Sequence, residues 1–143
     1  SIPSLKLFKN DKATDNLQQV FSPESTRRIA EILDSVASDN GSGYRAVIDG
    51  YSVAGKTGTA EMVIDGKYNK DGAKRTYFIG FSPAKNPKYI MAVRLDYPKK
   101  CFVSWDPTMR NRCEGSNSAS MAFQKAMKRI LINDPEIKSK FEG

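Results

Sequence analysis

The chain has 143 residues and a formal net charge of +7, with 39% hydrophobic residues, 27% charged residues and no histidine. This length fits one domain or part of one, and the composition is typical of a folded protein. The absence of histidine excludes Ser-His-Asp and Cys-His catalysis within the chain, and its two cysteines argue against a structural zinc site. Chemistry in this chain must therefore use Lys, Ser, Thr, carboxylates or backbone amides.

The positive charge is concentrated in the second part of the chain. Residues 1–50 carry six Lys and Arg against seven Asp and Glu, whereas residues 51–143 carry seventeen against nine, a net charge of +8. This part is expected to face nucleic acid, phosphate, a carboxylated substrate or an anionic surface, or to be a soluble basic surface only. No apolar run approaches the ~18 residues of a membrane-spanning helix, and the first residues lack a signal-peptide core.

The first predicted element is a helix that follows an irregular polar lead-in at residues 1–20. Ser22 is a favourable N-cap, and Pro23 suits the first helical position. The helix is expected to end at the Asn-Gly-Ser-Gly stretch at 40–43. Four apolar residues recur at helical spacing and give the helix one apolar face: Ile29, Ile32, Leu33 and Val36.

Residues 44–97 are typical of β structure. A short extended segment is expected at 44–48, and a longer extended run continues to 64, where Asp65 and Gly66 signal a hairpin turn. Two further strands are predicted at 76–81 and 89–96. Because short links join them, the three strands should form an antiparallel meander.

The last part of the chain combines a loop and a helix. Residues 99–114 are expected to form a basic loop bounded by Cys101 and Cys113, and this loop contains the single tryptophan, Trp105. A final helix is predicted from about 118 to 132, with apolar residues along one side. The elements together predict an α+β fold, in which helices flank an antiparallel sheet of three strands.

The stretch from Gly50 to Ala60 fits two motifs. The first is the P-loop, Gly-x4-Gly-Lys-Thr, in which backbone amides cradle phosphates, Lys56 reaches the terminal phosphate and Thr57 binds magnesium. A P-loop must open into a helix, but the residues after Thr57 are rich in Gly and β-branched side chains. A P-loop nucleotide-binding domain is therefore disfavoured and is kept as an alternative.

The second motif is Lys-Thr-Gly, which accompanies Ser-x-x-Lys and Ser-Asp-Asn in serine β-lactamases and penicillin-binding proteins. On an edge strand, Lys56 would supply a positive charge, and the hydroxyls of Thr57 and Thr59 would donate hydrogen bonds to a substrate carboxylate. Gly58 would let the substrate backbone approach the strand. A backbone N–H just beyond it would point at a developing oxyanion.

The surroundings make the second motif more specific. Four features follow one another: Ser-Pro-Glu at 22–24, Gly-Ser-Gly-x-x-Ala at 41–46, the run 50–60, and Phe-Ile-Gly-Phe-Ser-Pro-Ala at 78–84. This order resembles the C-terminal part of the transpeptidase domain of class B penicillin-binding proteins, and the division-type peptidoglycan D,D-transpeptidases are the most similar. The resemblance is dense over residues 21–98 and weaker over 115–131.

The resemblance implies that residues 1–143 are the C-terminal portion of a single, partial transpeptidase domain of the penicillin-binding and serine β-lactamase fold. Members of the family are penicillin-sensitive acyl transferases, in which a serine attacks the D-Ala-D-Ala end of a stem peptide and the acyl group passes to an amine. Lys56 would hydrogen-bond the serine of a Ser-x-Asn element. Thr57 and Thr59 would hold the terminal carboxylate of a stem peptide or β-lactam, and the N–H of Thr59 would be one oxyanion-hole donor.

The family's nucleophile is expected to lie N-terminal to these residues, so the chain alone is predicted to be inactive. Ser-Pro-Ala-Lys at 82–85 has the form Ser-x-x-Lys, but it follows the Lys-Thr-Gly motif and sits in a proline-bounded turn. Ser-Asp-Asn at 38–40 has the form Ser-x-Asn, but it lies at a helix end only eighteen residues before Lys56. Both are interpreted as structural.

The resemblance also implies a setting. The parent protein would be extracytoplasmic or periplasmic, anchored by an N-terminal transmembrane helix outside this chain, and would need no cofactor or metal. Its partners would be peptidoglycan stem peptides, β-lactam antibiotics and cell-division proteins, with no nucleic acid and no membrane contact by this chain. Disulfides form in such a compartment, so Cys101 and Cys113 are expected to be bonded, against the alternative of free thiols.

Two further interpretations stay open. Tyr77, Phe78, Phe81 and Tyr89 lie among lysines and arginines, which is typical of a stacking platform in a basic nucleic-acid-binding module, although no RNP-like or zinc-knuckle motif is present. Alternatively, a non-catalytic envelope protein of the same superfamily would keep the fold without the activity.

Overall fold

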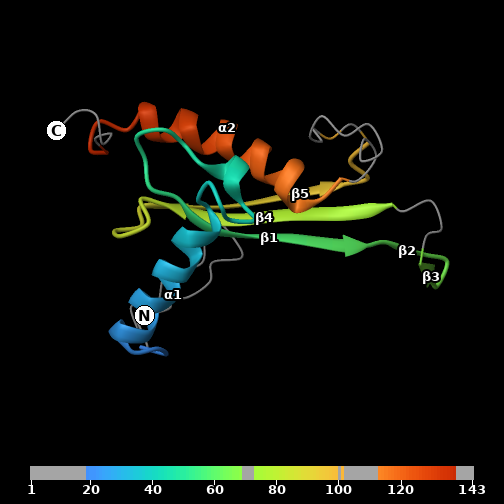
Figure 1. Cartoon of the computed structure of the whole chain (residues 1–143), viewed down its shortest axis with the longest axis horizontal. Coiled ribbons are helices and arrows are strands. Elements are labelled where there is room, and N and C mark those ends of the chain that lie inside the picture. Colours follow the sequence, from blue (N-terminus) through green and yellow to red (C-terminus); the bar gives the residue numbers. More distant parts are fainter. Residues whose placement is uncertain (1–18, 69–72, 100, 102–112, 138–143) are drawn as a thin grey trace, which may run out of the picture.

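The computed structural model describes residues 19–68, 73–99, 101 and 113–137 (Figure 1). The predicted lead-in at 1–20 and the loop at 99–114 lie mostly outside the described residues. The described elements are α1 (Pro23–Val36), the 3-10 helix η1 (Tyr44–Ala46), β1 (Ala54–Glu61), β2 (Val63–Ile64), β3 (Lys67–Tyr68), β4 (Lys74–Ser82), β5 (Tyr89–Asp96), the 3-10 helix η3 (Gly115–Asn117) and α2 (Ala119–Ile132).

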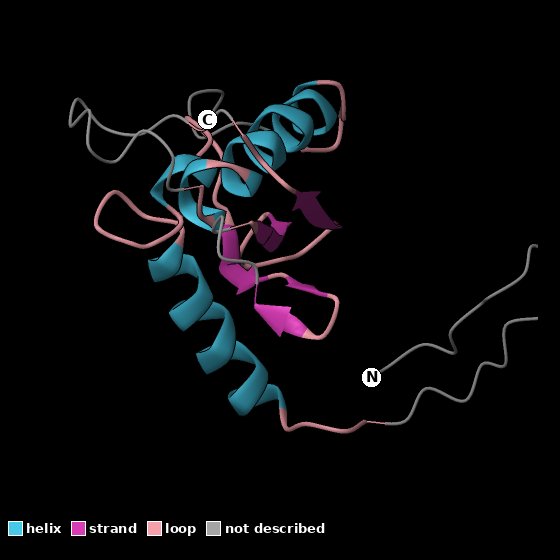
Figure 2. Ribbon diagram, turned by 90° about the vertical axis from the view of Figure 1, so that its right-hand side faces the viewer, coloured by secondary structure: helices cyan, strands magenta, loops and turns pink. Residues whose placement is uncertain are grey.

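The centre of the fold is a three-stranded antiparallel sheet with the order β1-β4-β5. Helix α2 covers one face of this sheet, and α1 lies beside the edge strand β1 and stands away from the sheet (Figures 1 and 2). The α+β architecture predicted from the sequence is therefore confirmed. Strand β5 has the predicted bounds, and its odd-numbered residues are the more buried ones, as the alternation of apolar residues indicated.

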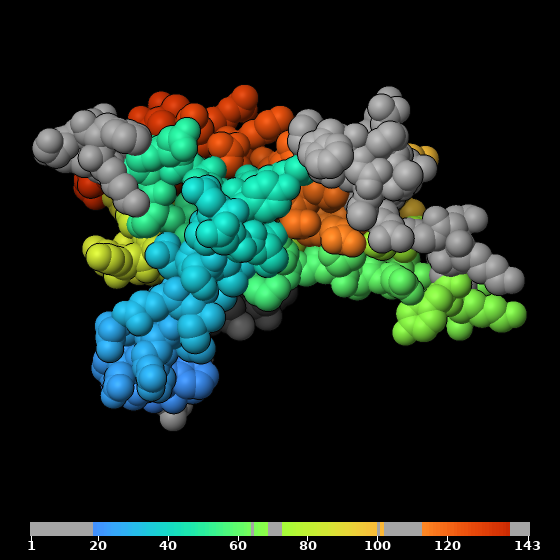
Figure 3. Space-filling model, in the orientation of Figure 1, coloured from blue at the N-terminus to red at the C-terminus, as the bar shows by residue number. Residues whose placement is uncertain are grey.

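A small hairpin, β2–β3, follows β1 and projects beyond the end of the sheet (Figure 3). Its turn is the predicted Asp65-Gly66 pair. Both residues have positive φ angles, 51° for Asp65 and 75° for Gly66, which suits a tight two-residue hairpin connection. The N–H of Met62 donates to the carbonyl of Ala73 at 2.9 Å and closes the base of the hairpin.

Helix α1 begins as predicted, and its apolar face is only partly covered. The hydroxyl of Ser22 caps the helix by accepting the N–H of Ser25 at 3.1 Å. Ile29 and Ile32 are 56% and 58% exposed, and no residue of α1 is buried. Leu33 and Val36, nearer the end of the helix, are half-buried, so the apolar face is covered only at the end of α1 that lies beside β1.

Residues 44–48 were expected to be extended, and this expectation was wrong. Tyr44–Ala46 form the 3-10 helix η1, in which the N–H of Ala46 donates to the carbonyl of Gly43 at 2.8 Å. The N–H of Gly43 in turn donates to Val36 at the end of α1 at 2.8 Å. These local bonds at a glycine-rich stop override the β propensity of the following residues and tuck Ala46 into the core.

The core is organised around Phe78 of β4 and Phe123 of α2. Both side chains are fully buried, and their ring centroids lie 4.6 Å apart. The Phe78 ring lies over two glycines: a Cβ added to Gly55 would lie 2.7 Å from Phe78 Cζ, and one added to Gly80 would lie 2.8 Å from Phe78 Cε1. Glycine on both strands thus makes room for the ring.

A polar cluster ties the end of α2 to the start of β5. The ammonium group of Lys88 lies 2.9 Å from the carboxylate of Asp134 and 2.5 Å from that of Glu136. The hydroxyl of Tyr89 donates to Asp134 at 2.6 Å. Hydrogen bonds from Tyr89 and Lys88 lower the pKa of Asp134 to about 2, which means that folding favours its ionised form.

This cluster predicts a pH-dependent contribution to stability. The pKa of Asp134 is lower in the folded state than its ordinary value of ~3.9, so the stabilisation is present above that value and is lost as the pH falls through about 2. The substitution Asp134→Asn should lower the thermal midpoint at pH 6, and the difference from the unmodified chain should shrink between pH 4 and pH 2. Circular dichroism melts test this, and a pH-independent difference would contradict it.

Candidate functional site

The residues of the Lys-Thr-Gly-Thr motif lie in the middle of β1. They pair in register with β4, so that Lys56 lies opposite Ile79, Thr57 opposite Phe78 and Thr59 opposite Thr76. Phe78 and Thr76 are buried beneath α2, and alternation along the strand directs Thr57 and Thr59 to that face and Lys56 and Gly58 to the other. Strand β1 is an edge of the described three-stranded sheet, so one side of its backbone is open to a ligand.

The long side chain of Lys56 bends around the strand edge and contacts Thr57, the next residue. Its Nζ donates to the carbonyl of Thr57 at 2.9 Å and to the Thr57 hydroxyl at 3.3 Å. The hydroxyl of Ser42 lies 3.3 Å from the same Thr57 hydroxyl. One cation and two hydroxyls thus meet at the edge of β1. No role had been predicted for Ser42, and its signal in the sequence is the Gly-Ser-Gly segment after α1.

The hydroxyl of Thr59 has a hydrogen-bond partner in the segment that precedes α2. The backbone N–H of Gly115 donates to Thr59 Oγ1 at 3.0 Å. A hydroxyl that accepts this bond keeps its own proton for another acceptor. Gly115 was also missed as a site residue, because it lies 56 positions from Thr59 in the sequence and only the tertiary structure brings the two together.

This arrangement suits a carboxylate. The hydroxyls of Thr57 and Thr59 belong to the same face of one strand, and the Lys56 ammonium group lies beside the first of them. A carboxylate only accepts hydrogen bonds, and a cation next to hydroxyl donors gives it charge-assisted bonds. Among the described residues, no group of three or more His, Cys, Asp or Glu side chains could hold a metal ion, and no helix is long and apolar enough to cross a membrane.

The structure contradicts the P-loop interpretation. Lys56 and Thr57 lie inside an extended strand that continues to Glu61, whereas a P-loop lysine and threonine must open a helix. The stacking-platform interpretation also fails at two of its aromatic residues. Phe78 is fully buried, and the Tyr89 ring is held at the α2 end by its hydrogen bond to Asp134.

The two serines that imitate catalytic motifs have structural partners. Ser82 is fully buried at the end of β4, and its hydroxyl donates to the carbonyl of Ser52 at 2.8 Å. Ser38 follows α1, and its hydroxyl donates to the carbonyl of Ser35 at 2.7 Å. Ser38 thus lies at a helix end, as interpreted from the sequence, whereas Ser82 ends β4 rather than lying in the predicted turn.

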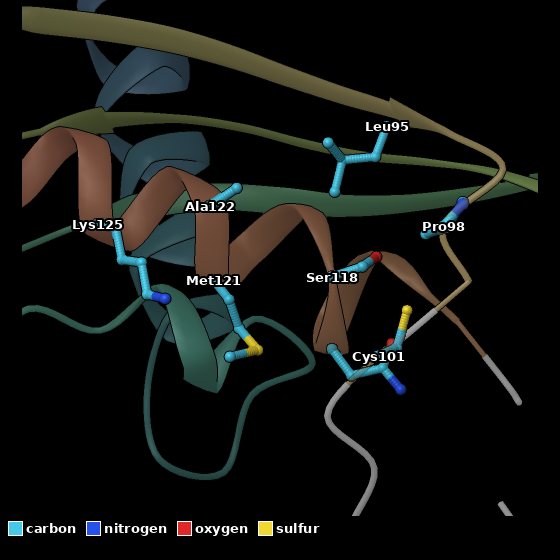
Figure 4. Close-up of a pocket in the computed structure, with 8 residues that line it drawn as sticks. Leu95, Pro98, Cys101, Ser118, Met121, Ala122 and Lys125 are labelled. Atoms are coloured by element: carbon cyan, nitrogen blue, oxygen red, sulfur yellow. The ribbon is translucent and has the colours of Figure 1, made fainter. Parts of the chain in front are cut away.

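A disulfide joins Cys101 to Cys113, with their Cα atoms 5.3 Å apart. Next to it, a hollow of about 280 Å³ opens between the end of β5 and the start of α2 (Figure 4). The hollow contains none of the Lys56–Thr59 residues. Its lining includes Leu95, Pro98, Cys101, Ser118, Met121 and Lys125. Trp105 lies outside the described residues.

Comparisons with known proteins agree with the resemblance seen in the sequence. The family model of the penicillin-binding protein transpeptidase domain matches residues 4–128. The peptidoglycan D,D-transpeptidase FtsI of Buchnera aphidicola is 33% identical over 135 residues, which cover 92% of this chain and 21% of that protein. This chain therefore spans about a fifth of the length of that relative.

Solved structures give the same result. The transpeptidase domain of FtsI4 D,D-transpeptidase from Legionella pneumophila has 33% sequence identity and a TM-score of 0.60, covering 76% of this chain and 36% of that one. Penicillin binding protein 3 from Mycobacterium tuberculosis, complexed with aztreonam, shares the fold with a TM-score of 0.63 at 23% identity, covering 92% of this chain and 31% of that one.

Two glycines of β1 should respond differently to the same substitution. Gly55→Ala should lower the free energy of unfolding by ~1–3 kcal/mol, because its Cβ would lie 2.7 Å from both the Ile79 carbonyl oxygen and the Phe78 ring. Gly58→Ala should cost less than ~1 kcal/mol, because its Cβ would meet Tyr77 Cβ at an ordinary 3.4 Å. Denaturant unfolding measures both, and equal losses would contradict the packing described here.

Proposed function

The chain belongs to the penicillin-binding protein transpeptidase domain family, and we propose that it is the C-terminal portion of the transpeptidase domain of a peptidoglycan D,D-transpeptidase. It spans 21% of the Buchnera relative and 36% of the solved Legionella domain, so the proposed activity belongs to a larger protein. The observation that carries the proposal is the position of the Lys56 ammonium group, 3.3 Å from the Thr57 hydroxyl and on the same edge strand as Thr59.

In this proposal, β1 binds the carboxylate end of the substrate. The hydroxyls of Thr57 and Thr59 donate to the terminal carboxylate of a stem peptide or of a β-lactam, and Lys56 supplies the opposite charge. Gly58 carries no side chain, so the substrate backbone can lie against the strand. The exposure of Lys56 and Thr59 supports this role, because groups that bind a ligand must be reachable from solvent.

The proposed reaction is acyl transfer in two steps. A serine outside this chain attacks the carbonyl carbon of the penultimate D-Ala, and the tetrahedral oxyanion accepts a hydrogen bond from the N–H of Thr59. The C–N bond then breaks and the terminal D-Ala leaves with a proton. An amine of a neighbouring stem peptide next attacks the acyl-enzyme, forms the new amide and frees the serine. In this scheme Lys56 also hydrogen-bonds the serine of a Ser-x-Asn element from the rest of the domain.

The setting of the parent protein is proposed to be the periplasm or another extracytoplasmic compartment, with a role in cell division. The Cys101–Cys113 disulfide supports this, because such bonds form and persist in oxidising compartments. Stem peptides and β-lactam antibiotics would be its ligands, and cell-division proteins would be contacted by other parts of the protein. A non-catalytic member of the same family is the competing possibility, which the experiments below exclude or establish.

The carboxylate clamp can be tested in the full-length protein. Thr59→Val removes one hydrogen bond to a charged group and should reduce the rate of acylation by a fluorescent penicillin about 10- to 100-fold. Lys56→Gln should reduce the rate further, because it removes the charge. Lys85→Gln is the matched control, since it removes an exposed lysine beyond β4. Equal rates in all variants would contradict the proposed site, and an unmodified protein that is not labelled would favour the non-catalytic member.

The chain by itself should not react. Ser82 is its one serine with a lysine three positions later, and that hydroxyl is buried and donates to Ser52. The 143-residue chain, incubated with fluorescent penicillin and then denatured, should carry no covalent label in a gel on which the full-length protein is labelled. Labelling of any serine of the chain would refute the assignment of the nucleophile to another part of the protein.

A further inference from the structure

The segment from Cys113 to Ser118 joins the disulfide to the proposed carboxylate-binding strand. At one end Cys113 is bonded to Cys101, which follows β5. At the other end the Ser118 hydroxyl is hydrogen-bonded to the buried Thr76 hydroxyl of β4 at 2.9 Å. Between these anchors, the N–H of Gly115 donates to Thr59 Oγ1. The segment is thus attached to all three strands of the sheet.

Glycine at position 115 allows an unusually close approach. A Cβ added there would lie 2.6 Å from the carbonyl oxygens of both Gly58 and Tyr77 and 3.0 Å from the nitrogen of Gly58. Gly115 is buried, and its backbone rests directly on the paired backbones of β1 and β4. These close contacts with the backbones of β1 and β4 fix the position of the Gly115 N–H that donates to Thr59.

The segment is also braced internally. The N–H of Glu114 donates to the Asn117 side chain at 2.6 Å, the N–H of Asn117 returns to the Glu114 carbonyl at 3.2 Å, and the Ser118 hydroxyl donates to the same carbonyl. These hydrogen bonds stabilise the turn from Glu114 to Ser118, but they do not attach Cys113, the first residue of the segment, to the sheet. Its ion pair, Lys74 with Glu114 at 3.7 Å, is partly exposed and weak. The covalent anchor at that end is the disulfide.

We propose that Gly115 is a positioning residue for carboxylate binding and that the Cys101–Cys113 disulfide holds it in place. This inference rests on the proposed function. The Gly115 N–H occupies an acceptor site of the Thr59 hydroxyl, so the Thr59 proton is directed away from Gly115 and towards the open side of the site. Without that N–H the hydroxyl rotates freely, and a carboxylate must order it at the moment of binding.

The disulfide is reachable from solvent on one side. Cys101 is half-buried and lines the hollow beside α2, whereas Cys113 is 3% exposed (Figure 4). A variant with serine at both positions removes the covalent anchor and introduces little change in volume. It therefore isolates the anchoring role better than Gly115→Ala, whose Cβ would collide with β1 and β4.

The decisive experiment is a double-mutant cycle in the full-length protein. C101S/C113S should reduce the rate of acylation by a fluorescent penicillin about three- to tenfold, the effect of losing one orienting hydrogen bond. In a Thr59→Val background the same pair of substitutions should change the rate by less than about twofold, because the hydroxyl they orient is absent. If C101S/C113S reduced the acylation rate by the same factor with and without Thr59→Val, the proposal would be overturned. Asp134→Asn is the matched control, since it weakens the fold far from Thr59 and should not alter the rate.

A second measurement does not depend on activity. Hydrogen exchange of the peptide that covers residues 113–118 should be faster in C101S/C113S and also in Thr59→Val, because each change releases the Gly115 amide. Unchanged exchange in both variants would overturn the positioning role. Absence of acylation in the unmodified protein would instead refute the proposed function, so the two failures are distinguishable.

Discussion

The packing of the Phe78 ring against glycine backbone is the contact on which the arrangement of the site depends. The ring lies over Gly55 of β1 and Gly80 of β4 and meets Phe123 of α2 on its other side. A shift of one residue in the pairing of β1 with β4 would put side chains under the ring and reverse the faces of the strand. Because Lys56 directly follows Gly55, the same contact that forms the core fixes where the cation and the threonine hydroxyls emerge.

Local sequence patterns were sufficient to predict much of this fold. The features that the sequence did not predict depend on contacts or hydrogen bonds that residue type alone does not specify. The Ser22 cap and the Asp65 turn depend on neighbouring residues, so their residue types were sufficient to predict them. The partial exposure of the apolar face of α1 and the contact between Gly115 and Thr59 depend on residues distant in sequence, which periodicity along the chain does not report, whereas η1 arises from local hydrogen bonds at the glycine-rich stop that propensity alone does not predict. The Lys-Thr-Gly-Thr residues were identified from a motif, because the proposed binding of a carboxylate requires specific residue types at fixed spacing.

The described residues form one wall of a site rather than an enclosed pocket. Lys56 and Thr59 are exposed on an edge strand, and the apolar residues Ile29 and Ile32 of α1 are exposed. Both features agree with a chain that covers about a third of a solved transpeptidase domain. A binding wall of this kind is useful only when its donors are held in place, and here the Thr59 hydroxyl accepts the Gly115 N–H, two residues from the Cys101–Cys113 disulfide.

The open edge of β1 has a consequence for solubility. An edge strand that can accept a ligand backbone can also accept the strand of another molecule, which makes it a site of aggregation. In β1 the charge of Lys56, the charge of Glu61 at its end and the two glycines all weaken strand-to-strand association, because exposed edges are protected by charged side chains and glycine disfavours strand pairing. The residue types that suit recognition of a small carboxylate thus also disfavour pairing of this edge with the same strand of another molecule.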